Sequence, residues 1–331
     1  MIGIASLPKK EREALFLNTS KKIGVPPGIV EKDFWVCYLL DYLFHRCAWK
    51  DRMVFKGGTS LLMAYHLIER FSEDIDLILD WRLLGYGIRE PWNPRSNTQQ
   101  DKFSESSQKK TIKLLEETFI PMVQADISTE IKEKAAIFLE QEEAAIVNFA
   151  YPQIYTDSSI LQVIRLEIGA LASWSPSQDS VISSFAAKQY PNIFERPETV
   201  IRTAVPERTF WEKVTILHRE ANREHGEFPR RYSRHYYDLY KLAASPVKIH
   251  AYQDLALLEN VVAFKMKFYR CPWAKYEEAL PGKIKLMPSE RYFPALQEDY
   301  SKMKNMIYGV IPTFDAIMTG IREMENEINQ L

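Results

Sequence analysis

Two aspartates separated by a single residue, Asp74 and Asp76, are the side chains of this sequence best suited to chemistry. They begin the alternating segment Asp74–Leu79, which is predicted to be a strand, and residues two apart on a strand project from the same face. Two carboxylates held this close repel each other unless a cation lies between them. Such a pair can share a divalent ion with the oxygens of a phosphate, so it predicts a Mg²⁺ site.

A glycine pair upstream of the aspartates predicts the phosphate half of that site. Gly57 and Gly58 lack β-carbons, so a phosphate can approach the backbone there, and the N–H groups of the helix that starts at Thr59 and Ser60 would point toward the anion. Each half alone is a weak signal, because Gly-Gly is often only a turn and Asp-x-Asp only a solvated strand edge. Their combination in strand, turn, helix, strand order predicts that a nucleoside triphosphate (NTP) binds here.

The elements that must position these residues can be read from periodicity and from proline and glycine punctuation. The first 50 residues are predicted to form two packed helices, a short strand is expected at Met53–Phe55 and a helix at Thr59–Glu69. The rest is expected to comprise an exposed insertion at Leu84–Gln108, mixed helix from about Lys109 to Phe149, β structure at Ile160–Ile168, Val181–Phe185 and Thr199–Ala204, and helices beyond Pro206.

Composition limits the kind of protein this can be. The 331 residues are 46% hydrophobic and 26% charged, as in ordinary folded proteins. No apolar run approaches the roughly 18 to 20 residues of a membrane span, and the N-terminus lacks a signal-peptide pattern, so we expect a cytoplasmic protein that does not enter a membrane. Three cysteines without paired spacing indicate neither a disulfide framework nor a zinc site.

Net charge of −1 gives no general attraction to nucleic acid, so any such binding needs a local basic patch. The segment from residue 213 to residue 235 is the candidate, with six basic residues against three acidic ones. Its arginines are Arg219, Arg223, Arg230, Arg231 and Arg234. A solvated loop explains the same excess.

The segments Phe55–Leu61 and Arg70–Leu77 closely resemble the AbiEii/AbiGii nucleotidyltransferase toxin family, which is related to the mycobacterial MenT toxins and belongs to the DNA polymerase β-like superfamily. Further similarity lies at Glu212-Lys213 and Tyr236–Leu239, where Lys213 and Asp238 match the family's lysine and aspartate. The segment Glu31–Val36 also resembles many members. The resemblance therefore extends in ordered pieces from about Val30 to Leu242.

The resemblance implies a role for each matched residue. Lys213 would contact the triphosphate and offset its charge, although without the family pattern a surface lysine is the better reading. Asp238 could contact Lys213, orient a nucleophile or cap a hydrogen-bond network. Superfamily members usually add a third carboxylate that ligates metal and accepts a proton, and Glu167 is the best-placed acid, unless it is an outward residue paired with Arg165. Asp80 and Asp157 are weaker candidates.

The expected fold is α/β (α+β): a polymerase β-like core with a mixed sheet and N-terminal helices in residues 1–205, and a helical C-terminal domain in residues 206–331 that completes the active site. An acceptor hydroxyl would attack the α-phosphate of an NTP between two Mg²⁺ ions and release pyrophosphate. The glycine turn lacks the Lys-Ser/Thr of a P-loop, and no G-x-S-x-G elbow accompanies the histidines.

The resemblance implies an RNA acceptor, the tRNA 3′ end in particular, and a toxin of a type IV toxin–antitoxin or abortive-infection system opposed by a separately encoded antitoxin. Two alternatives remain open at the level of sequence. One is nucleotide transfer to a protein hydroxyl, as AMPylating enzymes perform. The other is a degenerate member that only binds nucleotide or a partner, against which the intact Asp74, Asp76 and Lys213 argue.

Overall fold

The computed structural model describes residues 1–72, 74–140, 145–156, 161–171 and 176–331, and the chain folds into two compact units. The first unit comprises Met1–Ala64 and Glu73–Thr203, and the second comprises Tyr65–Ser72 and Ala204–Leu331. The chain therefore leaves the first unit before Tyr65, returns after Ser72 and leaves again after Thr203. Among the described residues, no helix has both the length and the apolar character needed to span a bilayer.

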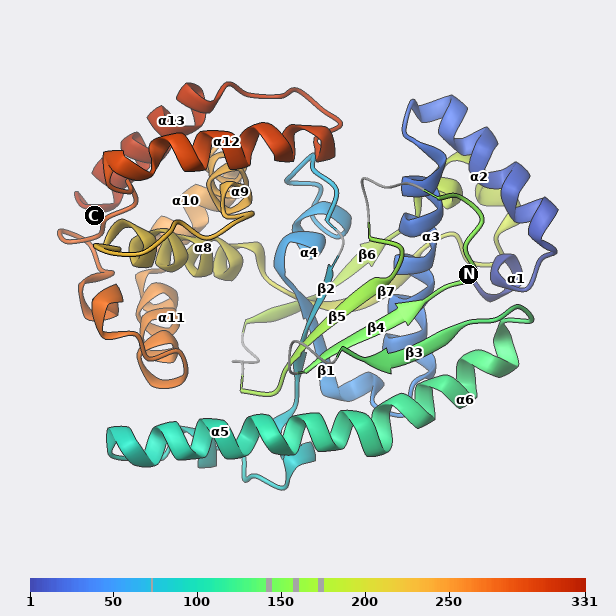
Figure 1. Cartoon of the computed structure of the whole chain (residues 1–331), viewed down its shortest axis with the longest axis horizontal. Coiled ribbons are helices and arrows are strands. Elements are labelled where there is room, and N and C mark those ends of the chain that lie inside the picture. Colours follow the sequence, from blue (N-terminus) through green and yellow to red (C-terminus); the bar gives the residue numbers. More distant parts are fainter. Residues whose placement is uncertain (73, 141–144, 157–160, 172–175) are drawn as a thin grey trace. The chain divides into compact units, whose positions relative to one another are not determined.

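One mixed sheet forms the centre of the first unit, and the described residues contribute seven strands to it in the order β3-β4-β5-β2-β1-β7-β6. The central strand β2 pairs antiparallel with β1 and parallel with β5, and β1 pairs parallel with β7 (Figure 1). The strands are β1 Met53–Lys56, β2 Asp74–Leu79, β3 Ala136–Leu139, β4 Ile146–Ala150, β5 Ile164–Gly169, β6 Ser177–Ile182 and β7 Thr199–Ala204.

The helices of the first unit include α3 (Pro27–Asp41), which is buried along most of its length. It starts with proline at its first position, where the missing N–H costs no hydrogen bond. Two of its acids are buried, and each accepts a backbone N–H of another segment: Glu31 accepts that of Ile154, and Asp33 that of Phe185. The other helices are α1 Ile2–Ala5, α2 Lys9–Ile23, α4 Gly57–Met63, α5 Asn97–Leu114, α6 Ile120–Glu130 and α7 Phe185–Gln189.

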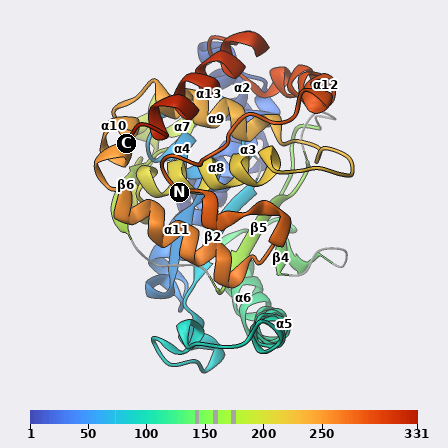
Figure 2. The ribbon, with the colours of Figure 1, turned by 90° about the vertical axis from the view of Figure 1, so that its left-hand side faces the viewer.

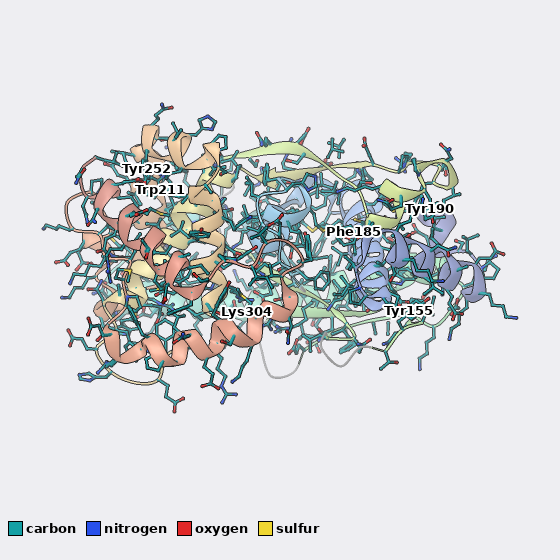
Figure 3. The ribbon with its side chains drawn as sticks, turned by 90° about the horizontal axis from the view of Figure 1, so that it is seen from above. Tyr155, Phe185, Tyr190, Trp211, Tyr252 and Lys304 are labelled. Atoms are coloured by element: carbon teal, nitrogen blue, oxygen red, sulfur yellow. The ribbon has the colours of Figure 1, made fainter. Side chains whose placement is uncertain are left out.

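The second unit is helical in its described residues (Figure 2). Helix α8 (Pro206–Ala221) packs against α9, α10 and α11, and its aromatic residue Trp211 lies with its ring centroid 6.2 Å from that of Tyr252 on α10 (Figure 3). Helix α9 (Ser233–Ala243) also packs against α12 and α13. The remaining bounds are α10 Pro246–Gln253, α11 Leu255–Phe268, α12 Phe293–Met303 and α13 Phe314–Ile328.

The mixed α/β class, the N-terminal helices and the helical region beyond Pro206 are confirmed, and the predicted strand Thr199–Ala204 matches β7. Between Leu84 and Phe149 the prediction is correct only in part: the chain is helical from Lys109 to Glu130, as expected, but not beyond. Helix α5 starts at Asn97 rather than near Lys109, because Ser96 and Gln99 form a reciprocal capping box. The expected helix toward Phe149 ends at Glu130 and is followed by β3 and β4, whose apolar runs are too short to distinguish from helix by periodicity.

Smaller differences concern single element ends. The strand expected from Ile160 begins at Ile164 in the described residues, and Ile160 itself lies outside them. The segment Val181–Phe185 is divided between β6 and α7, because the Ser184 hydroxyl accepts the N–H of Ala187 at 3.1 Å and caps a new helix. The helix expected at Thr59–Glu69 ends at Met63, after which the chain enters the second unit.

Candidate active site

The turn at Gly57 packs directly against the carboxylate of Asp76. Gly57 has φ of +80°, and a β-carbon at this position would lie 1.9 Å from Oδ2 of Asp76, so only glycine fits. The turn is fixed on both sides, because the Thr59 hydroxyl donates to the backbone oxygen of Asp74 and the Ser60 hydroxyl donates to that of Gly57 at 2.8 Å. The two predicted halves of the site are therefore adjacent within the first unit.

Pairing between strands brings a third carboxylate beside the aspartates. In the parallel pair β2–β5, Asp76 lies opposite Glu167 and Asp74 lies opposite Arg165. Paired residues project from the same face of a sheet, so the three acids and Arg165 share one face. Asp74 is buried, Asp76 is half-buried, and the Glu167 side chain is 40% exposed. The face is thus polar and open to solvent near Glu167.

Arg165 is a cation shared by Asp74, Glu167 and a further acid, Glu140. Its guanidinium lies 3.7 Å from Oδ1 of Asp74, 3.9 Å from Oε1 of Glu167 and 3.1 Å from Oε2 of Glu140. Burial alone would lower the pKa of Arg165, but the charges of Asp74, Glu140 and Glu167 outweigh burial and raise its pKa. A metal ion bound at Asp74 would therefore compete with Arg165 for the same negative charge.

The donor set fits a metal that also needs substrate. Within the described ranges, no group of three or more His, Cys, Asp or Glu side chains is arranged to hold a metal ion. Two carboxylates plus phosphate oxygens and water are, however, how Mg²⁺ is usually held in nucleotide sites, since it seldom occupies a cage made of protein alone. At Gly57 the Asp76 carboxylate lies where a β-carbon would be, so no side chain separates the backbone from this carboxylate. Asp74 and Asp76 thus suit a metal that arrives with a triphosphate.

Lys213 and Asp238 meet in the second unit, together with an arginine. Nζ of Lys213 lies 2.6 Å from Oδ2 of Asp238, and Arg70 binds both oxygens of the same carboxylate through Nε at 2.6 Å and Nη2 at 2.7 Å. All three side chains are buried. Of the roles considered for Asp238, contact with Lys213 is the one that the structure contains.

The buried cluster keeps an excess of positive charge. Burial alone would raise the pKa of Asp238, but Arg70 and Lys213 outweigh it and hold that pKa well below its usual range. Burial lowers the pKa of Lys213 and of the nearby His235, the latter far below its usual range, so His235 adds no charge at neutral pH. Two cations face one carboxylate, which favours binding of an anion beside them.

The weaker acidic candidate Asp80 lies just beyond the C-terminal end of β2, away from Asp74 and Asp76. Asp80 accepts hydrogen bonds from the Arg82 backbone at 2.9 Å and from Arg52 at 3.0 Å, so it closes a turn at the far end of β2. Asp157 lies outside the described residues.

The basic segment is less uniformly cationic than its sequence. Arg219 and Arg223 both pair with the buried Glu220, at 2.8 Å and 2.6 Å. Arg230 and Arg231 are exposed, whereas Arg234 is half-buried. The excess of charge is therefore divided between a paired group at the end of α8 and an exposed group before α9.

Two residues at these sites, Arg70 and Arg165, were missed by sequence reasoning. Arg70 stands 168 positions before Asp238, so no local spacing predicts that they pair. Arg165 was considered only as a partner of Glu167, and its approach to Asp74 depends on the β2–β5 register. The one available signal was a basic residue shortly before an acidic one: Arg70 precedes Asp74, and Arg165 precedes Glu167.

Comparison with known proteins defines the class. A family model described as the nucleotidyl transferase AbiEii toxin of type IV toxin–antitoxin systems matches residues 39–320. The chain therefore belongs to the AbiEii toxin family and is a nucleotidyltransferase. The match begins after Glu31–Val36, so that segment lies outside it. Its membership implies an NTP substrate and a separate antitoxin.

The solved structures that are similar to this chain include MenT4, a nucleotidyltransferase toxin from Mycobacterium tuberculosis. It is 13% identical, with a TM-score of 0.42, over 96% of this chain and 98% of that one. No curated protein matches the sequence.

Proposed function

We propose that this chain transfers a nucleoside monophosphate from an NTP to a hydroxyl of RNA, the tRNA 3′ end in particular, and that it does so in the cytoplasm as the toxin of its system. The observation that carries the proposal is the approach of Gly57 to the Asp76 carboxylate. A turn that excludes a β-carbon next to a carboxylate pair is suited to a phosphate and its counter-ion.

Asp74 and Asp76 would hold Mg²⁺, with two ions the expected number and Glu167 a further ligand in the same register. The metal would supply positive charge to the attacking and leaving oxygens. The chain's own residues would bind the triphosphate and accept the proton. The Gly57–Ser60 turn receives the triphosphate, and Glu167, which is partly exposed, accepts the proton of the attacking hydroxyl. The oxygen of that hydroxyl bonds to the α-phosphorus as the bond to the β-phosphate oxygen breaks and pyrophosphate leaves.

Lys213 would offset the charge of the leaving phosphates, while Asp238, itself bound by Arg70, holds its ammonium in place. Arg70, which binds the same carboxylate as Lys213, precedes Asp74 by four residues in the sequence. The strand that carries Asp74 and Asp76 is acidic and by itself repels a triphosphate. The excess positive charge of the cluster would offset that repulsion.

A labelling experiment tests the reaction and the acceptor together. Purified protein with Mg²⁺ and each α-labelled NTP should label RNA, whereas labelling of protein would favour the nucleotidylation alternative. Absence of any label with every NTP would favour a degenerate binding protein.

Substitutions then test the residues. Asp76→Ala and Asp74→Ala should each abolish transfer without loss of folding, since they remove charge repulsion rather than packing. The matched control is Asp80→Asn, which removes an acid of the same chain segment that pairs with Arg52 and Arg82 and should retain transfer. Equal loss of activity in Asp80→Asn and Asp76→Ala would contradict the assignment.

A further inference from the structure

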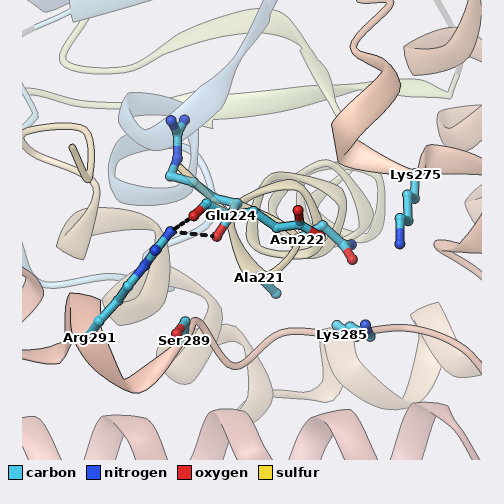
Figure 4. A pocket seen from close by; sticks show the side chains of 8 residues that line it. Ala221, Asn222, Glu224, Lys275, Lys285, Ser289 and Arg291 are labelled. Atoms are coloured by element: carbon cyan, nitrogen blue, oxygen red, sulfur yellow. Dashed lines mark hydrogen bonds between the residues drawn. The ribbon is translucent and has the colours of Figure 1, made fainter. Parts of the chain in front are cut away.

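A cationic pocket lies at the C-terminal end of α8 in the second unit (Figure 4). Its volume is about 310 Å³. Four basic side chains and one acidic side chain line it, together with small and polar residues: Ala221, Asn222, Arg223, Glu224, Lys275, Lys285, Ser289 and Arg291. Three of the four cations come from beyond residue 270, outside the basic segment that the sequence indicated.

Two of the cations are already engaged, and two are not. Arg223 pairs with Glu220 at 2.6 Å, and Arg291 donates to the backbone oxygen of Glu224. Neither Lys275 nor Lys285 forms an ion pair with any residue in the described part of the chain. Their ammonium groups are therefore the ones available to a ligand.

The pocket is built by a buried histidine that joins the two lysine-bearing segments. His218 is fully buried on α8; its Nδ1 accepts the backbone N–H of Lys285 at 3.1 Å, and its Nε2 lies 3.0 Å from the backbone oxygen of Lys275. Because Nδ1 accepts, the proton belongs on Nε2, which donates to that oxygen. Burial lowers the pKa of His218, so the ring stays neutral and both bonds persist at neutral pH.

The positive charge in the pocket exceeds what the C-terminal end of α8 requires. The C-terminus of a helix carries about half a negative charge, which one cation can balance. Glu220 already neutralises Arg223, so within the pocket the three other cations, Lys275, Lys285 and Arg291, face the single lining carboxylate of Glu224. The excess therefore calls for an anionic ligand.

An aromatic side chain next to the pocket indicates which anion. Trp273 is 40% exposed and precedes Lys275 by two residues, and the guanidinium carbon of Arg223 lies 4.7 Å from its ring centroid. Cations that bind a phosphate backbone next to an exposed aromatic ring that can stack on a base are typical of single-stranded nucleic acid sites. An acidic peptide would use the lysines but would gain little from the ring.

We propose that this pocket binds a backbone phosphate of the RNA acceptor through Lys275 and Lys285, with Trp273 stacking on a neighbouring base. The inference rests on the proposed RNA acceptor. Both this pocket and Lys213 belong to α8 or its end, and the nine residues from Lys213 to Asn222 span about 14 Å of helix. The pocket is therefore a separate contact for the acceptor, beyond the reacting hydroxyl.

The test measures KM for RNA and its salt dependence in Lys275→Ala, Lys285→Ala double variants. KM should rise several-fold, the slope of log KM against log salt should fall by about 1, and KM for NTP at saturating RNA should not change. Lys283→Ala with Lys302→Ala is the matched control, because both are exposed lysines of the same unit outside the pocket. Trp273→Ala should raise the KM for RNA about tenfold, and Trp273→Phe should restore most of the affinity.

The possible outcomes separate this inference from the proposed function. If the wild-type chain labels RNA but the double variant keeps the wild-type KM and slope, the pocket assignment is wrong and the RNA acceptor stands. If KM for NTP rises instead, the pocket binds free nucleotide, and the inference also fails. If the wild-type chain labels protein rather than RNA, the proposed function fails first.

Discussion

At the scale of single residues, Gly57 carries the strongest constraint in the candidate site. It combines a positive φ with contact to a carboxylate, whereas a glycine elsewhere usually shows only one of these features. The identity of this residue is therefore set by the site as well as by the backbone.

This constraint can be separated from backbone strain by comparing two glycines. Gly57→Ala should reduce transfer about a hundredfold or more, because its β-carbon would displace the Asp76 carboxylate by an ångström or more. Gly85 has φ of +84° with no atom near the position of a β-carbon, so Gly85→Ala carries the same backbone strain of about 1 kcal/mol without the displacement. The measurements are kcat and melting temperature for both variants. Similar losses of activity in the two would show that strain alone matters.

At the scale of elements, helix α3 ties the first unit together through buried polar residues. Lys32 donates to the backbone oxygen of Leu161 at 2.8 Å, Glu31 accepts two backbone N–H groups, and Asp33 accepts the N–H of Phe185 at the start of α7. The segment that resembled many family members, Glu31–Val36, thus has a structural reason for its composition. Its acids hold loops rather than substrate.

Asp33 should make the folded chain less stable as pH rises, whereas most acids in folded proteins have the opposite effect. Burial raises its pKa to about 7, from an ordinary value of about 4. The folded chain then binds a proton that the unfolded chain releases, so the contribution to stability is full below about pH 4 and is lost as pH rises toward 7.

Asp33→Asn keeps an oxygen to accept the Phe185 N–H and removes the titration. The urea midpoint of unfolding is measured for the variant and for wild type at several pH values. The midpoint of the variant should therefore rise relative to that of wild type from pH 4 to pH 7. The exposed Asp51→Asn serves as the control and should follow wild type throughout. If the urea midpoints of Asp33→Asn and wild type differ by the same amount at every pH, titration of the buried Asp33 is ruled out.

The elements also show how far sequence reasoning extends. Strand β2 and the Gly57 turn were predictable because local alternation and paired glycines signal them directly, and β7 was predictable from its β-branched alternation. Helix α5 was missed since its surface is mostly polar, although the Ser96–Gln99 capping box marked its start. Glu167 could be suggested, but its position beside Asp76 depends on the parallel register of β2 and β5, which no local pattern encodes.

At the scale of the whole molecule, charge is separated between the two units. The first presents acids on β2 and β5, and the second holds a buried cluster with an excess of cations, as well as the pocket at the end of α8. The overall charge of −1 hides this separation. The segment Tyr65–Ser72 connects α4 to the aspartate strand while belonging to the second unit, so the two charged regions share a covalent link next to Asp74.

The roles proposed for Asp76 and Lys213 predict that NTP binding is lost when either side chain is removed. A non-hydrolysable NTP with Mg²⁺ at about 100 times its Kd stabilises a protein by about 2.7 kcal/mol, which should raise the melting temperature of the wild-type chain by several degrees. Asp76→Asn and Lys213→Ala should each abolish that increase, because one removes the proposed metal ligand and the other removes the buried ammonium. Lys241→Ala breaks a different lysine–carboxylate pair of the second unit, to Glu69 at 2.9 Å. This variant should keep the increase in melting temperature with NTP. If Lys213→Ala lowers the melting temperature of the free protein but preserves the full increase with NTP, Lys213 only neutralises Asp238, and the triphosphate is held by the first unit alone.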